Sequence, residues 1–155
     1  MPSSLRDEIK QTKPFKSLEE EAMLSVERTA AVLLHRLSET FKPHDITPTQ
    51  YNVLRILRGA RPAGLCRNDI RERLIAQVPD VTRLIDRLVI AGLVERERTD
   101  ADRRIVTTRI TTTGLGLLKD LDEPVADAHR TQLGHLSTTQ LKALIDLLAL
   151  AREGA

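Results

Sequence analysis

Apolar residues recur along most of this chain at intervals of three and four positions, the spacing of one face of an α-helix. Three of these stripes follow a helix start signal, in which Ser17, Thr47 or Ser137 stands three positions before a glutamate or glutamine. We therefore expect long helices after each of these residues, the second of them ending at Gly59. Residues 1–16 show no such period and carry two prolines, so we expect a flexible N-terminal arm there.

The middle of the chain follows a different pattern. A short helix is expected around Ile70 and Leu74, and a second one opens at Pro79 after a tight connection. Two β-prone segments, 93–98 and 105–110, then flank a charged turn and are typical of a hairpin. The fold class expected is mainly α with a small β-hairpin wing, in which a winged helix-turn-helix lobe accompanies a helical dimerisation region.

The residue ranges of that single domain, 17–155, follow from these elements. The lobe spans 47–111, and the dimerisation helices span 17–46 and 112–155. Gly92 is placed to close the second lobe helix in a left-handed conformation. Pro124 interrupts a helical stripe, and because an interior proline costs ~3 kcal/mol in a straight helix, we expect a bend there or a helix break just before it.

The helix expected over 79–88 has two chemically distinct sides. Wound at about 100° per residue, it separates Thr82, Arg83, Asp86 and Arg87 from an apolar side made of Val81, Leu84, Ile85, Leu88 and Val89. A helix of this width fits the DNA major groove, where an arginine fork can take both acceptors of a guanine. The alternative is an ordinary amphipathic surface helix with a solvated charged face.

The charged turn of the hairpin is the second candidate for DNA contact. Arg103 and Arg104 are adjacent at its tip, so one could point toward a narrow minor groove while the other supports the turn. The alternative is an exposed tip whose arginines pair with Asp100 and Asp102.

Composition narrows the class of protein. The formal net charge is only +2, but five arginines fall between positions 96 and 109, whereas acidic residues gather toward both ends. Two phenylalanines and one tyrosine are too few for a single-strand stacking surface. The single cysteine excludes an intrachain disulfide and indicates a reducing, cytoplasmic setting. We expect no metal, no cofactor and no membrane partner, since cysteine pairs at ligand spacing and long apolar runs are both missing.

The order of these motifs resembles the multiple-antibiotic-resistance regulator (MarR) family of winged helix-turn-helix proteins. The resemblance runs from about Leu18 onward and rests on residues 54–57, 81–88, 92–96, 102–104 and 110–114. It departs from the family pattern at Ile110, where leucine is typical, and at Cys66, where a threonine-like cap is common.

The resemblance implies a homodimer that binds a pseudo-palindromic operator in double-stranded DNA. Such proteins look like repressors, often released by small phenolic or aromatic acids. The family's base-reading positions map onto Pro79, Thr82, Arg83 and Arg87, and its wing arginine onto Arg104, with Asp102 as the acid that orients the wing. Asn68 and Arg103 complete the expected set of DNA-binding residues.

Three further hypotheses concern residues outside that set. His35 and Tyr51 lie beside apolar helix faces and are candidates for ligand binding, the alternative being ordinary boundary residues. Cys66 could serve as a redox switch near a helix N-terminus, or simply fill a cap position. A protein-interaction module with this fold is the remaining alternative to a DNA-binding protein. An enzyme is not expected, because the four histidines are scattered and neither a catalytic triad nor a phosphate loop is present.

Overall fold

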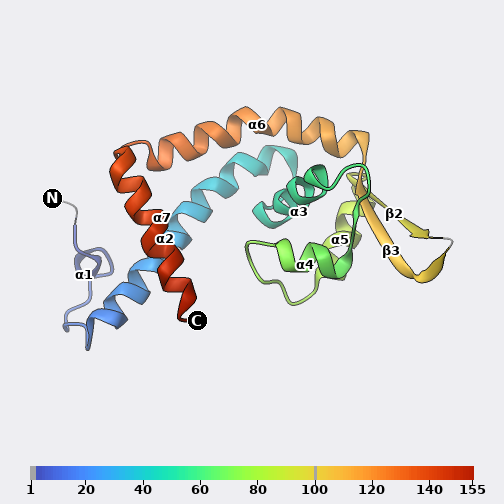
Figure 1. The fold of residues 1–155 in the computed structure, drawn as a ribbon. Helices are drawn as coiled ribbons and strands as arrows, with labels where there is room; N and C mark the ends of the chain where they lie inside the picture. Colours follow the sequence, from blue (N-terminus) through green and yellow to red (C-terminus); the bar gives the residue numbers. More distant parts are fainter. Residues whose placement is uncertain (1–2, 100) are drawn as a thin grey trace. The chain divides into compact units, whose positions relative to one another are not determined.

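The computed structural model describes residues 3–99 and 101–155 (Figure 1) and divides the chain into two compact units, Met1–Arg36 and Leu37–Ala155. The elements in chain order are α1 (Leu5–Glu8), α2 (Leu18–Phe41), the 3-10 helix η1 (Lys42–His44), α3 (Pro48–Gly59), β1 (Leu65–Cys66), α4 (Arg67–Arg73), α5 (Val81–Ile90), β2 (Val94–Thr99), β3 (Asp102–Ile110), α6 (Thr112–Leu133) and α7 (Thr138–Glu153). The predicted fold class, mainly α with a small β wing, is confirmed.

The first unit holds α1 and most of α2. The Ser4 side chain caps α1 by accepting a hydrogen bond from the Asp7 amide, so one helical turn forms inside the segment expected to be a flexible arm. At the start of α2, the Ser17 hydroxyl accepts from the Glu20 amide at 3.1 Å, as its spacing predicted. The Glu20 carboxylate reaches one residue further back than expected, to the Lys16 amide at 2.6 Å.

The hydrophobic core lies in the second unit. Its best buried side chains come from α3, α4, α5 and α6, and they pack together with Phe41 at the end of α2 and with the sheet. They include Val53, Leu54, Leu57, Ile70, Ile85, Leu88, Leu118 and Leu121. Each of the predicted inward residues on α3, namely Tyr51, Leu54 and Leu57, is buried.

The wing is a three-stranded antiparallel sheet in the order β1-β3-β2. The expected hairpin is formed by β2 and β3, with Val94 opposite Ile110 and Arg98 opposite Val106. The strand β1 was not predicted, and its two residues pair with Thr107 and Thr108 of β3.

The second lobe helix begins later than the sequence suggested. Its N-cap is Asp80, whose Oδ1 accepts from the Arg83 amide at 2.9 Å, and helical geometry starts at Val81. Pro79 therefore lies outside α5, and the predicted opening at Pro79 is wrong by two residues. At the other end, Gly92 has φ of +72° directly after the C-cap Ala91, as predicted.

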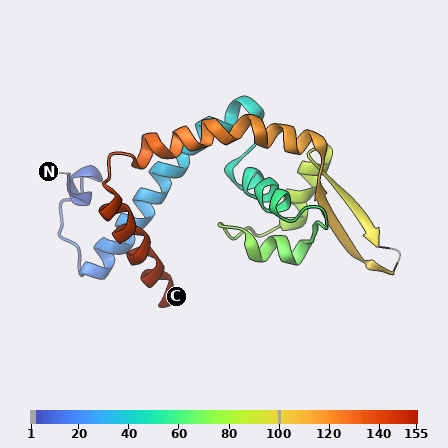
Figure 2. The ribbon, with the colours of Figure 1, turned by 45° about the horizontal axis from the view of Figure 1, so that its top comes forward.

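Pro124 does not break its helix. Figures 1 and 2 show α6 as one continuous helix, and Pro124 lies inside it. The expected break just before Pro124 is therefore wrong, whereas the alternative, a bend at Pro124, stays a prediction. Leu118, Leu121 and Val125 on either side of the proline are buried in the core, and this packing offsets the cost of the missing backbone hydrogen bond.

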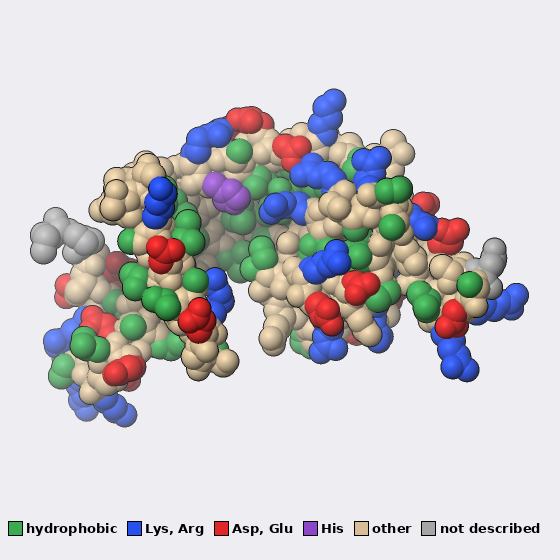
Figure 3. All heavy atoms as spheres, viewed as in Figure 1, with side chains coloured by type: hydrophobic (Ala, Val, Ile, Leu, Met, Phe, Trp, Pro, Cys, Tyr) green, Lys and Arg blue, Asp and Glu red, His purple; other side chains and the backbone are tan. Residues whose placement is uncertain are grey.

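The last helix, α7, begins with the expected capping box of Ser137 and Gln140 but has no buried residue. Ile145, Leu147 and Leu150 are each more than 60% exposed. Hydrophobic side chains gather along α7 on the face drawn in Figure 3. None of the helices in the described part of the chain is both long and apolar enough to cross a membrane.

Candidate nucleic-acid interface

The polar side of α5 is exposed, as predicted from the separation of polar and apolar residues along this helix. Val81, Ile85 and Leu88 are buried against the core, whereas Thr82, Arg83 and Arg87 face outward. Neither the Arg83 nor the Arg87 guanidinium forms a salt bridge with any described residue. Both guanidinium groups can thus contact a partner, and no ion pair has to break first.

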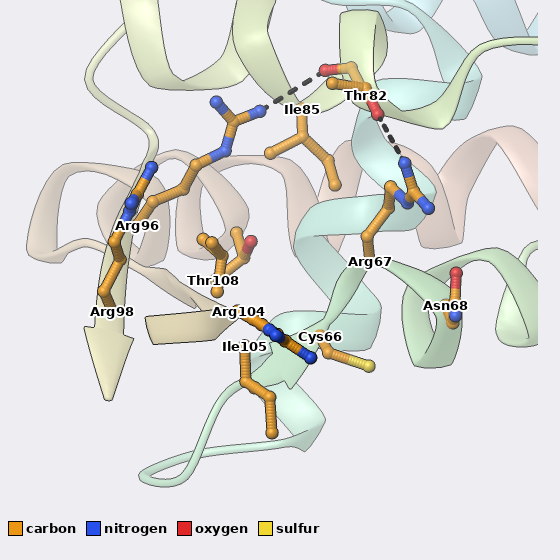
Figure 4. A pocket seen from close by; sticks show the side chains of 11 residues that line it. Cys66, Arg67, Asn68, Thr82, Ile85, Arg96, Arg98, Arg104, Ile105 and Thr108 are labelled. Carbon is orange, nitrogen blue, oxygen red and sulfur yellow. Dashed lines mark hydrogen bonds between the residues drawn. The ribbon is translucent and has the colours of Figure 1, made fainter. Parts of the chain in front are cut away.

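A hollow of about 680 Å³ opens between α5 and the inner face of the wing (Figure 4). Its charged lining is entirely basic: Arg67 on α4, Arg96 and Arg98 on β2, and Arg104 on β3. Asn68, Thr82, Ile85 and Cys66 are among the other residues that line it. The hollow is therefore positive and directly adjoins the exposed side of α5.

The two faces of the β2–β3 hairpin carry different charged side chains. Successive side chains of a strand point to opposite faces of the sheet. In the strand register Arg96 lies opposite Thr108 and Arg98 opposite Val106, so these four side chains share the inner face. The outer face carries Glu95 opposite Arg109 and Glu97 opposite Thr107. An ion pair joins Arg109 to Glu97 there. The acids of β2 are thus kept on the side away from the hollow.

Asp102, at the start of β3, accepts two hydrogen bonds. Its Oδ1 accepts a hydrogen bond from the Arg104 backbone N–H at 3.0 Å, and its carbonyl accepts from the Thr99 hydroxyl at 3.1 Å. Asp102 therefore contacts the backbone of Arg104 and forms no salt bridge with a described arginine. Asp100, the other acid considered for such a pair, lies outside the described residues.

The two arginines of the turn are both exposed but occupy different positions. Arg104 lines the hollow, whereas Arg103 does not. Basic side chains stand out at the free end of the hairpin in Figure 3. The remaining two predicted residues are also exposed: Asn68 at the hollow, and Pro79 in the connection before α5.

Thr82 is the centre of a polar network that the sequence did not reveal. Arg67 Nη1 donates to the Thr82 hydroxyl at 3.3 Å, and Arg96 Nη2 donates to the Thr82 carbonyl at 3.4 Å. The same Arg96 nitrogen lies 2.5 Å from Asp86 Oδ1. Strand alternation could have placed Arg96 and Arg98 on one face, but the contacts of Arg67 depend on tertiary packing.

The two candidate ligand residues are not part of this hollow. His35 is exposed on α2 in the first unit. Tyr51 is buried in the second unit, with its ring centroid 4.6 Å from that of Phe41. Burial raises the pKa of Tyr51, and the charge of Arg55 acts in the opposite direction. A role in ligand binding stays a prediction for both residues.

Cys66 is a half-buried free thiol at the N-cap of α4. Its Sγ donates a hydrogen bond to Oδ2 of Asp69, the third residue of α4, at 3.1 Å. The residues that the structure describes contain no cluster of three or more histidine, cysteine or acidic side chains suited to a metal ion.

A buried helix-turn-helix core, an exposed basic helix and a β wing define a winged helix-turn-helix protein. A model of the MarR family matches residues 44–105. The multiple antibiotic resistance protein MarR of Escherichia coli K12 is 32% identical over 113 residues, which cover 72% of this chain and 77% of that protein. The chain therefore belongs to the MarR family, whose members are DNA-binding transcription regulators.

Solved structures agree with this assignment. The MarR transcription factor from Planctomyces limnophilus is 44% identical with a TM-score of 0.68, over 88% of this chain and 99% of that one. A cysteine-to-serine mutant of E. coli MarR, solved in complex with operator DNA, is 27% identical with a TM-score of 0.76, over 96% of this chain and 99% of that one.

Proposed function

We propose that the protein binds operator DNA as a homodimer, with one α5 helix in each of two successive major grooves. The observation that carries the proposal is the division of α5 into a buried apolar side and an exposed side bearing Thr82, Arg83 and Arg87. Arginine forks take both acceptors of a guanine in the major groove. Arg83 and Arg87 are therefore the base-reading arginines of the proposal.

The positive hollow beside α5 supports a second contact, to the sugar-phosphate backbone. Arg98 and Arg104 line it without a salt bridge to any described residue. A cation that neutralises a phosphate releases condensed counterions, which strengthens binding to any sequence. Arg104 and Arg103 at the tip would extend this contact toward the minor groove, while Asp102 holds the turn in shape.

The exposed apolar side chains of the terminal helices favour a second copy of the chain as partner. Leu18, Met23, Val26 and Leu34 are exposed on α2, and Ile145, Leu147 and Leu150 on α7. Several large apolar side chains exposed on one helix are typical of an interaction site. A two-fold dimer with recognition helices about 34 Å apart would match a pseudo-palindromic site.

The related E. coli protein, whose mutant was solved in complex with operator DNA, supports operator DNA as the partner of this chain. We further propose that this chain acts as a repressor, because a dimer seated on an operator occupies the surface that a polymerase needs. A small aromatic ligand would release it only by binding more tightly to a form that cannot span two grooves. Benzoate and phenol, titrated against the protein and duplex complex, test this part.

Selection of bound duplexes from a random pool tests the main proposal. We expect enriched sequences that contain two inverted half-sites with centres one helical turn apart. Enrichment without symmetry would contradict the dimeric arrangement. A pool that stays random after several rounds would contradict sequence-specific binding and favour a protein-interaction module.

A further inference from the structure

Thr82, in the first turn of α5, is held by arginines from two other elements. The Arg67 guanidinium of α4 donates to its hydroxyl at 3.3 Å, and the Arg96 guanidinium of β2 donates to its carbonyl at 3.4 Å (Figure 4). Arg96 also pairs with Asp86 one turn further along α5. Three elements thus meet at one residue of the exposed recognition side.

The contact with Arg67 determines how the Thr82 hydroxyl can act. A threonine hydroxyl has one O–H donor and two lone pairs, whereas a guanidinium only donates. With Arg67 on one lone pair, a second lone pair and the hydroxyl proton remain. The positive guanidinium beside the oxygen opposes the approach of a second donor and strengthens the O–H as a donor, so Thr82 is biased toward donating to whatever lies against α5.

Bases differ in what they offer such a donor. In the major groove, guanine presents N7 and O6, adenine N7 and thymine O4 as acceptors, while cytosine presents only its N4 donor group. A free threonine could rotate its hydroxyl to accept from cytosine as well. A threonine beside the Arg67 guanidinium should favour the other bases over cytosine, because the positive charge opposes the approach of the cytosine amino group.

We propose that Arg67 is a positioning residue for specificity, which biases Thr82 toward donating and so favours an acceptor-bearing base at the position that Thr82 reads. This inference rests on the proposed function, because it requires α5 to lie in the major groove. Arg67 itself need not touch a base.

The hollow offers a matched control for this role. Arg98 lines the same hollow with the same charge, but its side chain makes no hydrogen bond or salt bridge with a described residue. Removal of Arg98 should weaken every sequence by a similar factor. Removal of Arg67 should in addition change the ranking of bases.

The experiment measures affinity for four duplexes that differ only at the base pair read by Thr82, identified as the pair whose preference is lost in Thr82→Val. We expect Arg67→Ala to reduce the preference for the best base at least fivefold. The double variant, Arg67→Ala with Thr82→Val, should show the same preference as Thr82→Val alone. Arg98→Ala should leave the ratios unchanged. Arg67→Lys, which retains a donor, should keep more of the preference than Arg67→Met.

Several results would overturn the inference. A uniform loss of affinity in Arg67→Ala across all four duplexes would make Arg67 a phosphate contact only, and equal ratios in Arg67→Lys and Arg67→Met would point the same way. If the wild-type protein shows no preference among duplexes, the proposed function fails before any variant is compared. Because Arg67 is exposed, we expect all variants to unfold at the wild-type urea concentration, which the same preparations can show.

Discussion

α3 and α7 begin in the same way and end up in different surroundings. Each starts with a capping box, Thr47 with Gln50 and Ser137 with Gln140, followed by apolar residues at helical spacing. α3 buries four side chains in the core of its own unit, whereas α7 buries none. Hydrophobic periodicity therefore predicts the helix and its apolar side, but not which molecule covers that side.

The different surroundings of α3 and α7 imply two sources of stability, burial within one chain and burial against a partner. Full burial of a leucine or isoleucine side chain stabilises by about 1.5 to 3 kcal/mol, and the lobe gains this within a single chain. The exposed side chains of α7, Ile145, Leu147 and Leu150, can gain it only through a partner, so the stability that they contribute should depend on protein concentration. In our account the lobe reads DNA and the terminal helices assemble the dimer.

The largest effect should come from the lobe core. Leu88 is fully buried on α5, so Leu88→Ala should reduce the free energy of unfolding by about 2 to 5 kcal/mol. Urea unfolding followed by circular dichroism measures the change. Ile90, two residues further on the same helix, is 86% exposed, and Ile90→Ala should change stability by less than about 0.5 kcal/mol. Equal losses in the two variants would contradict the assignment of the core.

The next effect concerns assembly. A charge at Leu147, which is 65% exposed in the single chain, should weaken the dimer by about 2 kcal/mol or more if a partner covers it. Sedimentation of Leu147→Asp over a range of concentrations should show a shift to monomer, whereas Lys142→Ala on the same helix should sediment as wild type. A dimer of unchanged affinity in Leu147→Asp would remove α7 from the interface.

A comparable effect is expected in DNA binding. Arg83→Ala should weaken operator binding by about 1 to 3 kcal/mol and relax the base preference, because a bidentate contact to a base is lost. Arg104→Ala should weaken all sequences more evenly and reduce the salt dependence of binding. Gel-shift titrations on operator and random duplexes at two salt concentrations measure both. Unmeasurable effects in both variants would contradict the assigned interface.

The smallest effect concerns the ion pair that joins α3 to α6. Arg58 binds Asp122 through both nitrogens of its fork, with distances of 3.0 and 3.1 Å, but the two side chains are 35% and 51% exposed. Exposed pairs contribute about 0.2 to 1 kcal/mol. A double-mutant cycle with Arg58→Met and Asp122→Asn should give a coupling free energy in that range. A coupling above 2 kcal/mol would mean that the pair is a principal link between the two helices.

Much of the fold could be predicted because it depends on local signals. The three start signals, the closing Gly92 and the alternation of the hairpin all act within a few residues. The helix start predicted at Pro79 is two residues early, because Asp80 supplies the capping oxygen and the first helical residue is Val81. Of the two outcomes expected at Pro124, a bend or a break just before it, the break does not occur, because the buried neighbours of the proline hold α6 together and the local pattern does not weigh them.

The candidate site was predictable in part for the same reason. The exposure of Thr82, Arg83 and Arg87 follows from the helical period alone. β1 and the contacts of Arg67 and Arg96 could not be predicted, since they join residues that are distant in sequence. The charges of the hollow thus become visible only when α4, α5 and the wing are folded together.

The number of chains bound to one selected duplex tests the central claim most directly. Sedimentation of a fluorescent duplex with excess protein should show two chains per duplex, and a duplex with one half-site removed should bind at least a hundredfold more weakly. One chain per duplex, with the same affinity for the half-site as for the whole, would contradict the division between a reading lobe and assembling terminal helices.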